Sequence, residues 1–223
     1  MKIAILLYPG FTALDCIGPY EVLSRLPGAE VTFTAAAAGA VTSDTGFLNV
    51  TATRGIDEVA AADLLLVPGG PGDQAVMRHE PTLEWIRRLH AGTTWTTSVC
   101  TGALILGAAG LLRGLRATTH WASLEELRSF GAEPVKARAV ESGKIVTAAG
   151  VSAGIDMALR LVQRIAGDDL ARGIQLGIEY DPAPPFRGGH PEAAEPEIVE
   201  AVRRQFEPLI EQRKSAMRAL GSR

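Results

Sequence analysis

The chain has 223 residues, of which 47% are hydrophobic, and 22 Lys and Arg against 25 Asp and Glu give a formal charge of −3 at pH 7. This length and composition predict a globular protein with a sizeable core, organised as a single domain over residues 1–223. Positive charges form no stripe that could neutralise a nucleic-acid backbone, and nowhere do 18 apolar residues follow one another. We therefore expect neither nucleic acid nor a membrane as a partner.

The chain contains two cysteines, Cys16 and Cys100, and neither belongs to a closely spaced pair. This spacing argues against a zinc site and a redox dithiol, and two cysteines cannot build a disulfide framework. The apolar run at the N-terminus has no small-residue cleavage site of the kind that ends a secretory signal. We expect a cytoplasmic protein with reduced thiols.

Short β-rich runs alternate with helical segments in the first half of the chain. Apolar residues dominate the expected strands, as they do in strands buried on both faces, at residues 2–8, 29–35, 63–70 and 94–100. Apolar residues spaced three and four apart predict helices over 16–26 and 81–92. The second of these begins with Pro81 and ends at Gly92, which is the usual asymmetry of helix ends. The alternation predicts an α/β fold with a doubly wound, mostly parallel, flavodoxin-like sheet flanked by helices.

The second half continues this pattern and ends in a different composition. Residues 136–150 read as two strands around a turn at Ser142 and Gly143, and residues 152–167 as a helix that ends at a glycine. Residues 180–196 are dense in Pro and Gly and predict an irregular segment. Residues 188–223 form a charged C-terminal extension, in which a surface helix with a frayed end is expected from residue 197.

Ligands of open parallel sheets bind outside the carboxyl ends of the strands, so the residues that follow each strand are the candidates for a site. Asp15 follows the first strand, and Gly69 and Gly70 follow the strand within 63–70. Cys100 follows the next strand, and Gly150 follows the last one. The fold class predicts that all of them meet at one rim of the sheet.

Cys100 stands between a strand and a helical run, where a sharp turn exposes a side chain at the top of the sheet. A helix N-terminus at that position favours the thiolate and lowers the pKa of a cysteine. The alternative is that Cys100 packs in the core, because cysteine is among the most buried residue types. The residues by themselves leave both interpretations open.

Asp15 and the paired glycines also allow two interpretations. Near the start of the first helix, an aspartate is most often an N-cap, whereas an Asp15 that faced the cysteine would be an acid–base group with a raised pKa. Gly69 and Gly70 are either turn residues or donors of backbone N–H groups to a developing negative charge. Neither alternative excludes the other.

Five stretches carry a resemblance to a known family: LYPGFTALDCIGPYEVL, DLLLVPGGPG, SVCTGALILGAAGLLRGLRATTHW, TAAGVSAGIDMALRLV and YDPAPPF. In this order and spacing they resemble the motifs of the ThiJ/PfpI superfamily, and within it those of the isonitrile hydratases. The resemblance extends from about residue 2 to residue 187.

The resemblance implies roles for particular residues. Cys100 matches the nucleophile, Asp15 matches the acid of this branch, and Thr101 matches the residue that follows the nucleophile. Because PfpI-type proteases have histidine in place of Thr101, a Cys-His peptidase is not expected. His120 matches a family histidine, which we expect to serve in packing or hydrogen bonding. We expect Cys16 to be structural.

The activity implied is the hydration of an isonitrile to an N-substituted formamide through a cysteine thioimidate, without a metal or other cofactor, with Gly69, Gly70 and Gly150 as substrate-binding positions. A homodimer is also implied. Two alternatives remain open: a regulatory ligand-binding domain related to AraC-type regulators, and a glyoxalase-like enzyme that acts on reactive carbonyls.

Overall fold

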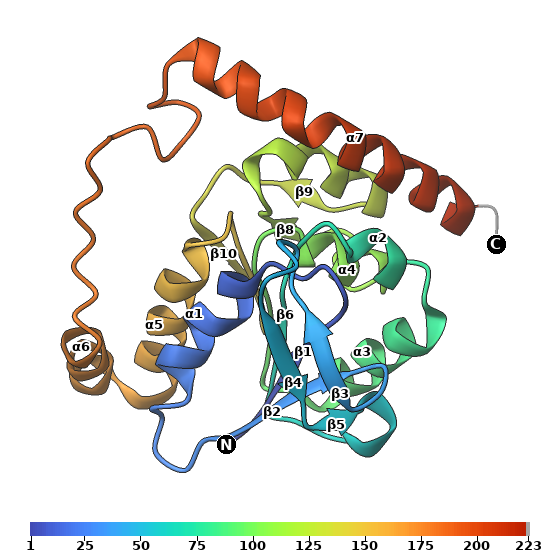
Figure 1. Ribbon diagram of the computed structural model, residues 1–223. Coiled ribbons are helices and arrows are strands. Elements are labelled where there is room, and N and C mark those ends of the chain that lie inside the picture. Colours follow the sequence, from blue (N-terminus) through green and yellow to red (C-terminus); the bar gives the residue numbers. More distant parts are fainter. Residues whose placement is uncertain (222–223) are drawn as a thin grey trace.

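A seven-stranded sheet forms the centre of the computed structural model, which describes residues 1–221 and the side chains of residues 1–215 (Figure 1). Its strands lie in the order β10-β11-β7-β6-β1-β2-β5. All neighbours run parallel except β10 and β11. Their bounds are β1 Lys2–Leu6, β2 Glu30–Ala35, β5 Arg54–Gly55, β6 Leu64–Val67, β7 Trp95–Ser98, β10 Ala139–Ser142 and β11 Ile145–Ala148. The predicted α/β fold with a mostly parallel sheet is confirmed.

Helices cover both faces of this sheet, which explains why two of its central strands, β1 and β6, are almost entirely apolar. Every residue of β6 is buried, as are all residues of β1 after Lys2. Figure 1 shows α1 (Ala13–Leu23) and α5 (Ala153–Ala166) side by side on one face, and α3 (Glu80–Gly92) and α4 (Gly102–Ala108) toward the other. Strands enclosed in this way have no solvent-facing side, so the alternation of apolar and polar residues disappears.

The sequence pattern did not predict most of the smaller helices and strands. They are the antiparallel hairpin of β3 (Gly39–Thr42) and β4 (Asn49–Ala52), the pair β8 (Arg116–Ala117) and β9 (Glu133–Pro134), the helices α2 (Asp73–Val76) and α6 (Asp168–Gly177), and the 3-10 helices η1 (Ile56–Glu58) and η2 (Trp121–Phe130). The hairpin strands are short and mostly exposed, so they lack an apolar run. The predicted C-terminal helix is α7 (Pro196–Gly221), and its expected frayed end includes residues 222–223, outside the described residues.

Two predicted boundaries differ from those observed. The first helix begins at Ala13, three residues before the predicted start, with Thr12 in the N-cap position. The third predicted strand ends at Val67 because Pro68, which follows, has no N–H to donate to a neighbouring strand. The turn between β10 and β11 and the helix end at Gly167 agree with the prediction.

The topology places the candidate residues on adjacent strands. β11, β7, β6 and β1 are consecutive in the sheet, and their carboxyl ends lead to Gly150, Cys100, Gly69 and Asp15 in that order. The chain leaves β1 toward β2 on one side and later returns to β6 on the other side. Such a reversal of strand order opens a crevice at the carboxyl ends, where ligands of doubly wound folds bind.

Gly102, the first residue of α4, allows the turn after β7 to approach β6 closely. A Cβ at this position would lie 2.1 Å from the Val67 carbonyl oxygen. Gly92, at the end of α3, has no heavy atom within 4 Å of the corresponding position. The close approach therefore requires glycine at residue 102 and does not require it at residue 92.

We predict that Gly102→Ala lowers the free energy of unfolding by about 1–3 kcal/mol, because overpacking forces the backbone to move. Gly92→Ala should be neutral or stabilise by up to about 1 kcal/mol, because it only restricts the unfolded chain. Urea unfolding of both variants measures the difference. Equal stabilities would contradict the close approach of α4 to β6.

Candidate active site

The backbone of Cys100 is held in a conformation that residues other than glycine rarely adopt. Its φ is +55°, in the left-handed region, at the turn between β7 and α4. Its N–H donates to the Ala149 carbonyl at 2.8 Å, and its carbonyl accepts from the Thr119 hydroxyl at 2.7 Å. Backbone strain of this kind persists only where the surroundings hold it in place, and it is concentrated at functional sites.

Asp15 lies in the first turn of α1 but does not cap that helix. Thr12 occupies the N-cap position, and the Asp15 carboxylate accepts the N–H of Gly69 at 2.8 Å, across from the end of β6. The side chain is fully buried, and its Oδ1 has no hydrogen-bond partner among the described residues. Asp15 and the Cys100 thiol interact directly. The structure therefore favours a carboxyl group that faces the cysteine over a helix cap.

Burial decides the protonation of both groups. It raises the pKa of Asp15 to about 8, against a smaller opposing effect of the Gly69 N–H. Burial also raises the pKa of Cys100 well above its usual value, and Asp15 raises it further, while the Thr101 N–H acts in the opposite direction. The sequence predicted a lowered thiol pKa at a helix N-terminus, but loss of hydration outweighs the helix at this depth.

Thr101 packs closely against Gly69 and Gly70, next to Cys100 and Asp15. The Thr101 hydroxyl accepts the N–H of Gly70 at 3.1 Å. A Cβ on Gly69 would lie 2.4 Å from the Thr101 nitrogen, and Gly70 has a φ of +135°. Both glycine N–H groups thus bind protein oxygens, which leaves the Thr101 N–H as the backbone donor that acts on the sulfur.

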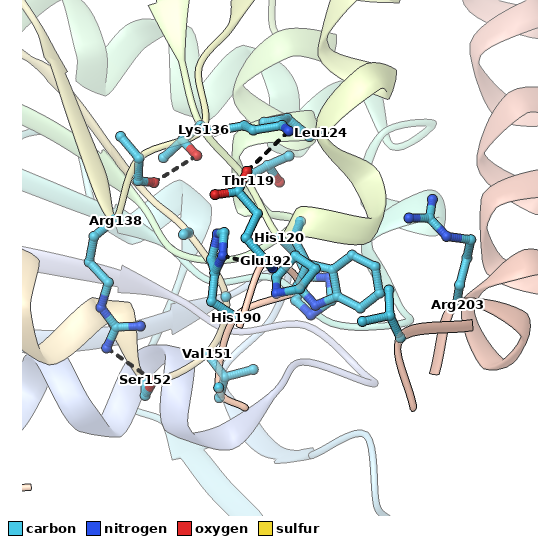
Figure 2. Close-up of a pocket in the computed structure, with 18 residues that line it drawn as sticks. Thr119, His120, Leu124, Lys136, Arg138, Val151, Ser152, His190, Glu192 and Arg203 are labelled. Atoms are coloured by element: carbon cyan, nitrogen blue, oxygen red, sulfur yellow. Dashed lines mark hydrogen bonds and ion pairs between the residues drawn. The ribbon is translucent and has the colours of Figure 1, made fainter. Parts of the chain in front are cut away.

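A cavity of about 650 Å³ opens beside the turn that carries Cys100. Thr119 and Ala149, which hydrogen-bond to the backbone of Cys100, both line it. Figure 2 shows that separate parts of the chain converge on it, with Val151 and His190 among the labelled residues. Gly150 lines it as well. The cavity therefore borders two residues that hold the backbone of Cys100, whereas Cys100 itself is not among the residues that line it.

His120 forms part of this cavity and packs as the sequence predicted. Its Nδ1 accepts the N–H of Ala122 at 3.3 Å, and its ring lies 4.7 Å from that of Phe206 on α7. A Cβ on Gly150 would lie 2.9 Å from the His120 ring, so glycine at 150 leaves room for it. Burial lowers the pKa of His120 to about 4, with a further contribution from Arg213, and the ring is neutral at pH 7.

Two charged residues near Cys100, Asp73 and Arg213, were not predicted from the sequence. Asp73 follows the glycine turn after β6, and its carboxylate is ion-paired at 2.9 Å with Arg213 of α7. Asp73 could have been found from its place directly after the VPGGPG motif. No local pattern identifies Arg213, because its contact joins residues that are 140 positions apart.

No group of three or more His, Cys, Asp or Glu side chains within the described residues is arranged to hold a metal ion. Over the same part of the chain, no helix is both long and apolar enough to cross a membrane.

The fold and the cysteine at its strand-to-helix turn define a family. The sequence profile of the DJ-1/PfpI family matches residues 1–164, and the chain belongs to this family. The resemblance found in the sequence motifs is thereby confirmed.

Individual relatives extend the similarity to nearly the whole chain. The isonitrile hydratase of Pseudomonas putida is 44% identical over 213 residues, which cover 96% of this chain and 93% of the relative. A crystal structure of a ThiJ/PfpI family protein from Pseudomonas syringae superimposes with a TM-score of 0.93 at 36% identity, covering 97% of this chain and 90% of that one. The transcriptional regulator CdhR of Pseudomonas aeruginosa is 29% identical over 183 residues, 78% of this chain and 53% of the regulator.

The raised pKa of Asp15 predicts how stability depends on pH. The carboxyl has a pKa near 3.8 in an unfolded chain and about 8 in the folded protein, so only the folded state holds the proton between these values. The stabilisation is complete below pH 4 and is lost as the pH rises through 8. Compared with Asp15→Asn, whose amide does not titrate, the wild type should lose up to about 1.4 kcal/mol per pH unit in this window.

Urea unfolding of both proteins at several values between pH 4.5 and 8 measures this difference. A gap between wild type and Asp15→Asn that stays constant, or that shifts in favour of the wild type as the pH rises, would contradict a protonated Asp15.

Proposed function

We propose that the protein is an isonitrile hydratase that converts an isonitrile and water to an N-substituted formamide. The observation that carries this proposal is the buried Cys100–Asp15 pair at the carboxyl ends of adjacent strands. The 44% identity to the Pseudomonas putida enzyme over nearly the full chain supports the same reaction. The substrate is a small molecule.

The first chemical step adds the thiol across the terminal carbon of the isonitrile. Sulfur of Cys100 forms a bond to this carbon while the protonated carboxyl of Asp15 gives its proton to the same carbon. The thiol proton passes to Asp15, which is restored to its acid form. The product is the thioimidate Cys100–S–CH=N–R, and no net charge is created at the buried site.

Water then releases the product. The protonated carboxyl of Asp15 gives its proton to the imine nitrogen and takes a proton from the attacking water through its other oxygen, which gives a tetrahedral Cys100–S–CH(OH)–NH–R and leaves Asp15 in its acid form. The C–S bond breaks, the hydroxyl proton returns to sulfur, and the formamide leaves. The Thr101 N–H is the donor placed to stabilise charge that develops on sulfur in either step.

The cavity beside the turn is suited to hold the substituent R. Its lining includes the apolar side chains of Val151, Leu124 and Trp121 together with the neutral ring of His120. The lining also contains the charged residues Lys136, Arg138, Glu192 and Arg203, so the cavity offers both apolar and polar contacts to the substituent. Gly150 borders this space and would keep it open.

Two alternative functions have weaker support. A regulatory domain is suggested by CdhR, but identity to that protein is 29% and the match spans 53% of its length. A role on reactive carbonyls would use the same cysteine. Side-by-side assays with cyclohexyl isonitrile and methylglyoxal separate this alternative from isonitrile hydration.

We also infer a cytoplasmic homodimer. Both cysteines are free, and the mechanism needs the Cys100 thiol in its reduced state. The side chains of Phe186 in the extended segment and Leu176 on α6 are each 81% exposed, as expected for a surface that a second copy covers.

Replacement of Cys100 tests the covalent mechanism. We predict that Cys100→Ala abolishes formamide production from cyclohexyl isonitrile and leaves the fold intact. Cys16→Ser is the matched control and should retain most activity, because the Cys16 thiol contacts the Ala13 carbonyl and burial raises its pKa to about 12. Full turnover by Cys100→Ala would rule out a thioimidate on this residue.

Asp15→Asn tests proton transfer. The amide keeps the size and an acceptor for the Gly69 N–H but cannot exchange a proton, so kcat/KM should fall by about 10²–10⁴-fold. Thermal unfolding in the same buffer checks that the fold remains. Turnover near that of the wild type would require another proton donor, and His120 would be tested next.

Sedimentation at micromolar concentration tests the assembly. We predict a species of twice the 23.5 kDa chain mass. A fully active monomer would contradict the dimer.

A further inference from the structure

Arg213 is a buried cation that the C-terminal helix α7 brings to the body of the protein. Its side chain is 3% exposed. Nε donates to both carboxylate oxygens of Asp73, at 3.0 and 2.9 Å, and Nη1 donates to the Ser123 hydroxyl at 3.0 Å. Nη1 also lies 3.5 Å from the Glu126 carboxylate. Figure 1 shows α7 lying across this part of the molecule, where it contacts both η2 and α2.

Asp73 connects this cluster to the residue after the nucleophile. Its side chain is 1% exposed, and its N–H donates to the Gly70 carbonyl at 3.1 Å. Its carboxylate interacts with the Thr101 side chain, whose oxygen accepts the N–H of Gly70. Hydrogen bonds from Arg213 to Asp73, from Asp73 to Gly70 and from Gly70 to Thr101 thus connect the guanidinium to the residue after Cys100.

The charges around the sulfur come from several elements. Asp15 on α1 and Asp73 on α2 are acidic, and Arg213 on α7 is the cation that acts on Cys100. The Tyr8 hydroxyl, after β1, also interacts with Cys100 and donates to the Pro68 carbonyl.

The remaining titratable groups face the guanidinium. Burial raises the pKa of Glu126 on η2, and Arg213 opposes that rise. His120, at the start of η2, is neutral. Burial by itself lowers the pKa of Arg213, but Asp73 and Glu126 together raise it, so the guanidinium stays charged.

We propose that Arg213 is a positioning residue of the active site, which holds Asp73 and through it the Thr101 hydroxyl, and which places a buried positive charge toward the Cys100 sulfur. The catalytic part of this proposal rests on the proposed isonitrile hydration. The C-terminal extension would then be a component of the site, although the family profile ends at residue 164.

A purely structural role would give a different set of effects. If the ion pair only anchors α7, removal of either partner loosens the same contact and has the same effect on Cys100. If the charge acts on the sulfur, the two partners have opposite effects, because Arg213 favours the thiolate and Asp73 opposes it.

The experiment measures the rate of Cys100 alkylation by iodoacetamide between pH 7 and 10, with the modified residue identified by mass spectrometry. The rate follows the thiolate fraction below the pKa. Arg213→Met should slow alkylation about tenfold at a fixed pH, as expected for a pKa rise of about one unit when an opposite charge is removed. Asp73→Asn should accelerate it several-fold.

Arg204→Met is the matched control on the same helix. Arg204 pairs with Glu200 at the surface, with side chains 69% and 52% exposed, and its loss should change neither the alkylation rate nor the melting temperature. Arg213→Lys retains the charge and should keep the alkylation rate near that of the wild type even where stability falls. If Arg213→Met does not fold, the pair of Asp73→Asn and Arg213→Lys still tests the charge.

Faster alkylation in both Arg213→Met and Asp73→Asn, or no change in either while the melting temperature falls, would overturn the proposal and leave Arg213 as an anchor. For Arg213→Lys, slow alkylation would also overturn it. Alkylation requires no isonitrile, so this outcome is independent of the proposed reaction. If the reaction is confirmed, kcat/KM should fall in Arg213→Met and recover in part in Arg213→Lys.

Discussion

The candidate site depends on the strained backbone at Cys100. A φ of +55° turns the chain sharply after β7, and it is held by hydrogen bonds to Ala149 on one side and Thr119 on the other. Ala149 follows β11, and Thr119 belongs to the segment before η2. The strain at one residue is therefore balanced by elements that come from different parts of the chain, which fixes the sulfur relative to Asp15.

Burial gives this site its chemical character. A charged group loses its hydration at this depth, so the acid and the thiol both hold protons at neutral pH. With a pKa of about 8, Asp15 gives up its proton more readily than the thiol. An isonitrile is a neutral molecule, and its addition to a neutral thiol with proton transfer through Asp15 creates no lasting charge. The low polarity that would penalise an ionic reaction is thus compatible with this one.

Local sequence pattern predicted the strands that carry the site and that its residues meet at one rim of the sheet. Apolar runs identify the strands, and ligands of parallel sheets bind at the carboxyl ends of the strands. These two observations suffice to place Cys100, Asp15, Gly69 and Gly150 at the same edge of the sheet. The direction of the thiol pKa was predicted wrongly, because a helix N-terminus can be recognised in a sequence whereas the depth of burial cannot.

Long-range contacts set the limit of sequence interpretation. Arg213 lies in a segment that was interpreted as a charged surface helix, and most of its neighbours on α7 are indeed exposed. Only the path of the chain after α6 brings its side chain to Asp73. An ion pair between residues so far apart leaves no periodicity or spacing that a single sequence could reveal.

The central claim is that Cys100 forms a covalent thioimidate, and rapid acid quenching followed by intact-protein mass spectrometry tests it most directly. During the first turnover with excess cyclohexyl isonitrile, the account predicts a transient mass increase equal to one isonitrile, located on Cys100 by peptide mapping. Formation of formamide while Cys100 remains unmodified at every time point of the first turnover would contradict it.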